Sequence, residues 1–166
     1  LRSLVGSEMC IRDSVYTARH DKDTSAIDAT NPNTAPTRRV ELDELLRTSD
    51  VVSVHCPLTE QTRHIIDAEA LAAMKSTAYL VNTARGACVD EKALVTALRN
   101  GEIAGAGLDV YENEPGIEPE LYDMDNVVLL PHIGSAARRT REKMTELAAR
   151  NIAAVLGGRD ALTPVG

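Results

Sequence analysis

Residues 78–110, AYLVNTARGACVDEKALVTALRNGEIAGAGLDV, decide the fold. Residues 78–82 and 104–110 are short apolar runs of the length that predicts buried strands. Between them, Asp90 is a candidate helix N-cap, Leu94 and Leu98 lie one helical turn apart, and Asn100-Gly101 is typical of a helix end. A strand, a helix and a second strand in this order predict a βαβ unit with parallel strands.

The same alternation continues on both sides of this unit. Further strands are predicted at 14–17, 51–55 and 127–130, with helices at 41–47, after a cap at Asp67, and at 136–156. The last helix carries its apolar residues on one stripe: Met144, Leu147, Ala148, Ile152 and Val155. Residues 20–37 are interpreted as a polar loop that contains Pro32. Because the strands are almost continuously apolar, we predict an α/β fold with a Rossmann-like, doubly wound parallel sheet.

The composition narrows the class of protein. The chain has neither Trp nor Phe, so its core must be aliphatic, and its net charge of −7 argues against binding to a nucleic-acid backbone. No apolar run approaches the roughly 18–20 residues of a membrane span. The three cysteines, Cys10, Cys56 and Cys88, have no metal-binding spacing, so we predict no metal site, a reduced cytoplasmic protein, and cysteines that serve as small buried hydrophobes.

Polar residues follow several of the predicted strands. In a parallel sheet of this kind, ligands bind beyond the carboxyl ends of the strands, where Arg85, Asp109, Glu114 and His132 would gather. An Arg can hold a carboxylate through two hydrogen bonds, and a His beside a carboxylate can supply a proton near neutral pH. Simpler interpretations stay open: solvated loop residues for Arg85 and Glu114, a turn cap for Asp109, and a strand-end side chain for His132.

Several longer segments resemble one known family. They are VHCPLT at 54–59, VNTARG at 81–86, VDE at 89–91, GAGLDVY at 105–111, EP at 114–115 and LPHIGS at 130–135. In this order and spacing they are similar to the signatures of the D-isomer-specific 2-hydroxyacid dehydrogenases, closest to the glyoxylate/hydroxypyruvate reductases. The resemblance runs from about residue 15 to residue 165, which makes it far more specific than any single motif.

The resemblance implies a role for each matching residue. Arg85 would bind the substrate carboxylate and polarise the carbonyl, His132 would be the general acid, and Glu114 would favour the imidazolium form of His132. Asp109 would meet the nicotinamide carboxamide, and Gly134 would permit close approach beside His132. The remaining residues would line the cofactor: Cys56, Pro57, Thr62, Thr83 and Ala84.

The implied activity is hydride transfer between NAD(P)H and a small 2-oxo acid. The acid is glyoxylate or hydroxypyruvate, and the sequence leaves open which of the two is the substrate. Residues 15–20, VYTARH, contain no carboxylate before Asp21, whereas an acidic residue there would hold the ribose of NAD. We therefore predict NADPH as the preferred cofactor, with Arg19 on the 2′-phosphate. The alternative is a solvated Arg19 and the use of NADH. The resemblance also implies a homodimer.

One family feature is missing from the sequence. No GxGxxG turn precedes the strand at 14–17, and residues 1–14 match nothing that follows. We therefore expect a C-terminal fragment: an unmatched segment at 1–14, a partial NAD(P)-binding domain at 15–135 without its first βα unit, and a helix and tail at 136–166 that return toward a substrate domain. Such a fragment would leave the first strand apart from the others and would turn over little. The alternatives are a non-catalytic, dinucleotide-sensing corepressor-like module and an inactive fragment of the dehydrogenase.

Overall fold

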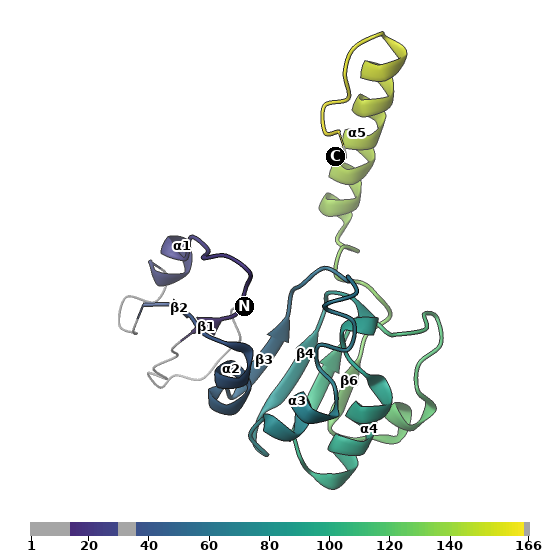
Figure 1. Ribbon diagram of the computed structural model, residues 1–166. Coiled ribbons are helices and arrows are strands. Elements are labelled where there is room, and N and C mark those ends of the chain that lie inside the picture. Colours follow the sequence, from purple (N-terminus) through teal and green to yellow (C-terminus); the bar gives the residue numbers. More distant parts are fainter. Residues whose placement is uncertain (1–13, 30–35, 165–166) are drawn as a thin grey trace.

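Four parallel strands form the main sheet of the protein (Figure 1). The computed structural model describes residues 14–29 and 36–164. The strands are β3 (Val51–Val54), β4 (Tyr79–Asn82), β5 (Gly105–Leu108) and β6 (Val127–Leu129), and they lie side by side in chain order. Val52 lies beside Leu80, and Leu80 beside Ala106, so the strands are in register at their centres. The predicted parallel α/β fold is confirmed.

Three helices cover one face of this sheet: α2 (Leu42–Thr48), α3 (Ala68–Ala73) and α4 (Glu91–Asn100). The Asp67 carboxylate accepts a hydrogen bond from the Ala70 amide at 2.9 Å, and Asp90 caps α4 through the Lys92 and Ala93 amides. Gly101 ends α4 with φ of 68°, a left-handed conformation that glycine adopts without strain. Both predicted caps and the predicted helix end are confirmed.

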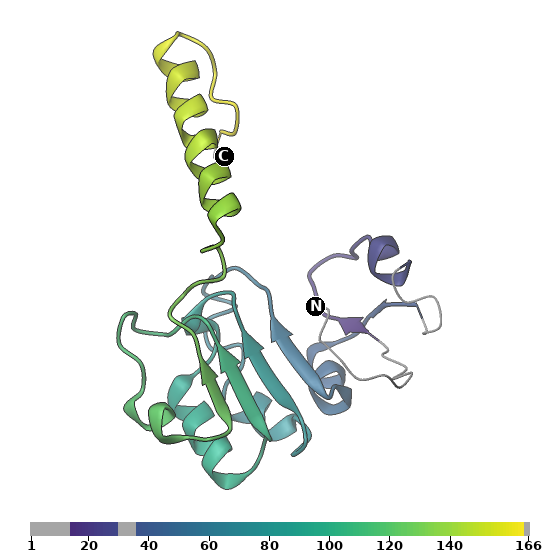
Figure 2. The same ribbon diagram turned by 180° about the vertical axis from the view of Figure 1, so that it is seen from behind.

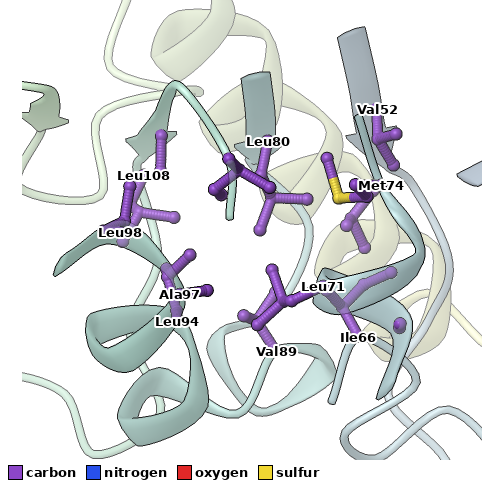
Figure 3. Packing of buried hydrophobic residues seen from close by; sticks show 14 of the residues in the cluster. Val52, Ile66, Leu71, Met74, Leu80, Val89, Leu94, Ala97, Leu98 and Leu108 are labelled. Atoms are coloured by element: carbon purple, nitrogen blue, oxygen red, sulfur yellow. The ribbon is translucent and has the colours of Figure 1, made fainter. Parts of the chain in front are cut away.

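The aliphatic core lies between the sheet and these helices (Figure 3). Leu80 from β4, Leu71 from α3 and Leu94 from α4 are fully buried. Burial of a side chain of this size stabilises the fold by about 1.5–3 kcal/mol. This packing, made without Phe or Trp, fixes the positions of the loops that follow β4, β5 and β6.

The opposite face of the sheet carries no helix among the described residues (Figure 2). Val51, Tyr79 and Val128 point to this face and are 55%, 52% and 62% exposed. The residues that follow Val51 and Tyr79 along their strands are buried under the helices, which is the two-residue alternation of a sheet with one covered face.

Residues 14–29 and 36–40 form a separate small unit. The strand β1 (Val15–Tyr16) pairs in parallel with β2 (Arg38–Arg39), and α1 (Ser25–Asp28) lies between them in sequence. The expected separation of the first strand from the main sheet is therefore confirmed. β2 was not predicted, because two adjacent arginines have no apolar alternation. Pro32 and Cys10 lie outside the described residues.

The helix α5 (Arg138–Leu156) stands clear of the sheet in both views (Figures 1 and 2). Its prediction is confirmed within two residues, but its apolar stripe is exposed: Met144 is 52% and Ile152 60% accessible, and Ala154 is its one buried residue. None of the helices in the described ranges is long and apolar enough to span a membrane. The remaining elements are two short 3₁₀ helices, η1 (Gly86–Cys88) and η2 (Pro119–Asp123).

Candidate active site

The predicted site residues lie at the carboxyl ends of three adjacent strands. Arg85 follows β4, Asp109 follows β5 and His132 follows β6, so the parallel topology brings all three to the same edge of the sheet. The Asp109 amide donates to the Asn82 carbonyl at 3.0 Å, which joins the end of β4 to the end of β5. The edge predicted from the sequence is therefore present as one continuous rim.

His132 and Glu114 form a direct pair. Nδ1 of His132 lies 2.8 Å from Oε2 of Glu114, and the other carboxylate oxygen accepts the Tyr111 amide at 2.9 Å. These two hydrogen bonds, the one from His132 foremost, lower the pKa of Glu114 below its ordinary value. The His132 side chain remains 52% exposed, so its other ring nitrogen is open to a ligand. The pair has the form of an imidazole oriented by a carboxylate.

Asp109 holds the turn that presents His132. Its Oδ1 accepts the Ile133 amide at 2.8 Å and its Oδ2 accepts the Gly134 amide at 2.7 Å, while the residue is only 3% exposed. His132 itself has φ of 53°, a left-handed conformation that is uncommon outside glycine. A Cβ on Gly134 would lie 3.0 Å from Oδ2 of Asp109, so a small residue suits this position. The turn-capping interpretation of Asp109 is thus observed, and its contact with a nicotinamide stays a prediction.

A buried asparagine shapes the turn that presents Arg85. The Asn82 side chain accepts the Ala84 amide at 3.1 Å and donates to the Arg85 carbonyl at 3.0 Å. Asn82 is 1% exposed, whereas Arg85 is exposed and its Nη1 donates to the Ala84 carbonyl at 2.6 Å. The guanidinium therefore projects at the rim and retains further donors for an anion.

Gly86 joins the Arg85 turn to the Glu114 loop. A Cβ built on Gly86 would lie 1.8 Å from the Tyr111 carbonyl carbon and 2.4 Å from the Glu112 amide nitrogen. Two backbone segments thus touch where no other side chain fits. This contact places the residue after Arg85 directly against the loop that carries Glu114.

Two further carboxylates brace the same loop. Glu91 is 4% exposed; its Oε1 accepts the Glu112 amide and its Oε2 accepts the Glu118 amide at 3.3 Å. Burial, the largest cause, raises the pKa of Glu91. The Glu112 carboxylate in turn accepts His64 Nε2 at 2.7 Å and Arg63 Nη2 at 3.0 Å. The loop between β5 and η2 is therefore held at both ends.

A hollow of about 590 Å³ opens beside Arg85. Four of the five predicted lining residues that follow β3 and β4 lie around it: Cys56, Pro57, Thr83 and Ala84. Thr62, the fifth, is not among the lining residues, because its hydroxyl donates to the Pro57 carbonyl at 2.6 Å and closes the turn behind the wall. His55, Leu58 and Arg85 complete the lining. The mixture of apolar walls and polar rim suits a planar, polar heterocycle.

Arg19 reaches the same region from the small N-terminal unit. Its Nη2 donates to Oε1 of Gln61, in the turn that follows the Pro57-Leu58 wall of the hollow. Arg19 and His20 are both exposed. The contact joins the predicted phosphate-binding side chain to a residue three positions after Leu58, which lines the hollow, although β1 is not part of the main sheet.

Several residues that build the site were absent from the sequence prediction. Asn82 could have been found, since a polar residue at an inward position of an apolar strand needs internal partners. Glu91 gave no such signal, because an acidic residue in the first turn of a helix is ordinarily a surface residue. Gly86 received no role of its own, because its contact with Tyr111 joins segments too far apart in sequence for any local pattern.

Residues 14–134 match a family described as D-isomer specific 2-hydroxyacid dehydrogenase, NAD binding domain. The chain is also similar to a glyoxylate reductase of Thermofilum pendens, with 58% identity over 120 residues that cover 71% of this chain and 35% of the relative. The chain thus spans about a third of the length of this curated relative.

Two solved structures resemble the fold closely. A glyoxylate reductase from Paecilomyes thermophila superposes with a TM-score of 0.81 at 42% identity, over 92% of this chain and 44% of that one. An NADPH-dependent glyoxylate/hydroxypyruvate reductase from Sinorhizobium meliloti, in complex with NADP and malonate, has a TM-score of 0.81 at 38% identity, over 93% and 46% of the two chains.

Proposed function

The chain belongs to the D-isomer specific 2-hydroxyacid dehydrogenase family, and from this membership we propose that Arg85, Glu114 and His132 take part in reducing a small 2-oxo acid to the D-2-hydroxy acid. The observation that carries the proposal is the 2.8 Å pairing of His132 with Glu114 at the same sheet edge as Arg85. A proton donor, its orienting carboxylate and an anion-binding guanidinium are what reduction of a carbonyl beside a carboxylate requires.

Each side chain has a separate task in this proposal. The Arg85 guanidinium binds the substrate carboxylate through two parallel N–H donors. His132 gives the proton of its exposed ring nitrogen to the carbonyl oxygen, and Glu114 stabilises the imidazolium and fixes the ring through Nδ1. Asp109 acts as a positioning residue, because its carboxylate holds the two amides that follow His132.

The residues around the hollow fit part of a nicotinamide dinucleotide, which when bound supplies the hydride for C2 of the substrate. Pro57, Leu58 and Ala84 offer apolar walls, and Thr83 a hydroxyl at the rim. The residues present would hold the nicotinamide half of the dinucleotide.

We propose NADPH as the preferred form of this cofactor. The support is the exposed Arg19 beside Gln61, close to the hollow, together with the lack of a carboxylate in residues 15–20. Dinucleotide fluorescence titrations of the wild type, Arg19→Asp and the charge-conserving Arg19→Lys test this point. Arg19→Asp should reverse the ratio of NADPH to NADH affinity, and an unchanged ratio contradicts the assignment.

Glyoxylate and hydroxypyruvate are the proposed substrates, since the similar proteins from Thermofilum pendens and Sinorhizobium meliloti carry these names. We further propose that residues 15–135 form the dinucleotide-binding part, that residues 136–166 return toward a substrate domain, and that the protein is a homodimer. The exposed apolar side chains of α5 support a helix that is covered in a larger assembly. Light scattering at two protein concentrations tests the dimer.

The decisive experiment is turnover by the protein expressed from its gene, followed as NADPH and NADH oxidation with glyoxylate and hydroxypyruvate. His132→Asn tolerates the left-handed backbone and removes the acid, so kcat should fall about 10²–10⁴-fold. Arg85→Lys should mainly raise KM, because an ammonium cannot form the paired hydrogen bonds. Arg63→Lys, on the far side of Glu112, is the control. Tight dinucleotide binding without turnover of either acid contradicts the reductase and favours a sensing module.

A further inference from the structure

Two free cysteines face each other at one wall of the hollow. Sγ of Cys56 lies 3.8 Å from Sγ of Cys88, although the residues are 32 positions apart in sequence. Cys56 follows β3, is half-buried and lines the hollow, whereas Cys88 ends η1 and is fully buried. One thiol is therefore open to a small dissolved oxidant and the other lies within contact distance behind it.

The backbone already holds the two cysteine-bearing segments together. The His64 amide donates to the Ala87 carbonyl at 2.9 Å, and the Ile66 amide donates to the Cys88 carbonyl at 3.1 Å. Gly86 is fixed against the Tyr111 backbone, so η1 has little freedom to move away. A disulfide has a sulfur–sulfur distance of about 2.0 Å, so the sulfurs need to approach by about 1.8 Å, a distance that side-chain rotation and small loop shifts can supply.

We propose that Cys56 and Cys88 form a reversible disulfide when the protein meets a peroxide. The Cys56 sulfur attacks one peroxide oxygen and the O–O bond breaks. Cys56 becomes a sulfenic acid, while the other oxygen takes up the thiol proton of Cys56 and leaves as water or an alcohol. The Cys88 sulfur then attacks the Cys56 sulfur, and the S–OH bond breaks. The hydroxyl leaves with the Cys88 proton as water. Overall, two thiols lose two electrons and the peroxide gains them.

The buried position of Cys88 decides the order of these steps. Burial, with a smaller contribution from the hydrogen bond of Cys56, raises the pKa of the Cys88 thiol to about 11, so this thiol stays protonated and unreactive toward dissolved oxidants at neutral pH. Cys56 is the residue that a peroxide can reach, and Cys88 is the partner that resolves its sulfenic acid. Arg85 lines the hollow and lies three residues before Cys88, so the bond would join one wall residue, Cys56, to the turn that follows Arg85.

The bond itself does not depend on the proposed function. The effect of the bond on cofactor binding does rest on the proposed function. If the hollow holds a nicotinamide, movement of Cys56 toward Cys88 changes the wall of the hollow, and dinucleotide affinity should fall on oxidation. A reductant should restore it, since a disulfide is reversed by excess thiol. Separate measurements of the bond and of binding distinguish the failure of one idea from that of the other.

The test uses the full chain with Cys10→Ser, which removes the third cysteine. After treatment with hydrogen peroxide, intact mass should show the loss of two hydrogen atoms, and peptide mapping should find residue 56 linked to residue 88. A thiol reductant should reverse both results. Cys56→Ser and Cys88→Ala, each in the same background, should show no linked peptide, and circular dichroism establishes that each variant is folded.

Stable oxidation of Cys56 to a sulfinic acid, with Cys88 still reduced in the folded Cys10→Ser protein, overturns the proposal. So does a linked peptide that appears only in urea, because the folded geometry would then not be its cause. Urea titration of the oxidised and reduced forms gives an independent readout: the native bond should raise the unfolding midpoint of the Cys10→Ser protein and leave that of Cys88→Ala unchanged.

Discussion

Two regions of the molecule differ in how well their apolar side chains are buried. The sheet unit consists of β3 to β6 with α2 to α4, and the flanking elements are β1, β2 and α5. In the sheet unit, three leucines from three different elements are completely buried in one shared core: Leu71 from α3, Leu80 from β4 and Leu94 from α4. In α5, Val155 and Leu156 are 57% and 83% exposed. The sheet unit is therefore stabilised by its own core, whereas the apolar side chains of α5 take no part in that core.

The proposed chemistry is divided between these two kinds of structure. Arg85, Glu114 and His132 all stand on loops of the sheet unit, where buried side chains accept backbone amides: Asn82, Glu91 and Asp109. Arg19 stands on the two-stranded β1–β2 unit, whose paired residues are half-buried or exposed. The comparison indicates that the proposed reaction site is held by packing, whereas the proposed cofactor selection depends on a less well packed part of the molecule.

The largest expected effect comes from removing core volume. Leu80→Ala should lower the free energy of unfolding by about 2–5 kcal/mol, because Leu80 is fully buried at the centre of the sheet. Ile152→Ala on α5 removes a side chain that is 60% exposed and should cost less than about 0.5 kcal/mol. Urea unfolding measures both changes. Equal losses would mean that the two regions are packed alike.

Gly86→Ala should produce the next largest effect. The added Cβ would lie 1.8 Å from the Tyr111 carbonyl carbon, so the η1 turn or the Glu114 loop must shift, at a cost of about 1–3 kcal/mol. Gly107→Ala is the matched control, because nothing lies within 4 Å of its Cβ. Thermal unfolding compares the two. A neutral Gly86→Ala would show that these backbones can separate freely.

The next comparison concerns the N-terminal caps of α4 and α5, where the expected changes in stability are smaller. Asp90 accepts two amides at the start of α4, so Asp90→Ala should cost about 1 kcal/mol of global stability. Ala137 at the start of α5 makes no side-chain cap, and Ala137→Asp should increase the hydrogen-exchange protection of α5 amides while the global unfolding midpoint stays the same. A shift of that midpoint would show that α5 unfolds together with the sheet unit.

The smallest expected effect depends on pH. The pKa of Glu114 is lowered by His132 and the Tyr111 amide, so its carboxylate adds stability above its unfolded pKa of about 4.5, and this contribution is lost as the pH falls through the lower folded pKa. Glu114→Gln should flatten that part of the acid unfolding profile. Glu118→Gln serves as the comparison. An acid limb unchanged by Glu114→Gln would mean that the pair contributes no stability.

Local signals predicted most of the sheet unit. Asp67, Asp90 and Gly101 mark helix ends by their own chemistry, and the strands are short apolar runs, so both were read correctly from neighbouring residues. Exposure of the α5 stripe was not predicted. A helical period such as Leu147 with Ile152 shows which side of a helix is apolar but not whether anything covers that side.

The site was predictable to the level of residues but not of contacts. Parallel topology alone places Arg85, Asp109 and His132 at one edge, and the pairing of His132 with Glu114 followed from the family resemblance. The Gly134 amide donates to Asp109, and the Glu112 amide donates to Glu91. No sequence motif predicts either hydrogen bond. Any residue has a backbone amide, so only the folded chain shows which carboxylate accepts it.

The turn at His132 also determines the order in which mutations can accumulate. Asp109, rather than His132 itself, holds the amides of Ile133 and Gly134 in place. A lineage that loses the histidine therefore keeps the turn and can regain the proposed acid by a single reversion. A lineage that loses Asp109 first loses the platform, and the histidine is then no longer maintained by selection. Descendants that have abandoned the reaction should more often retain the aspartate than the histidine.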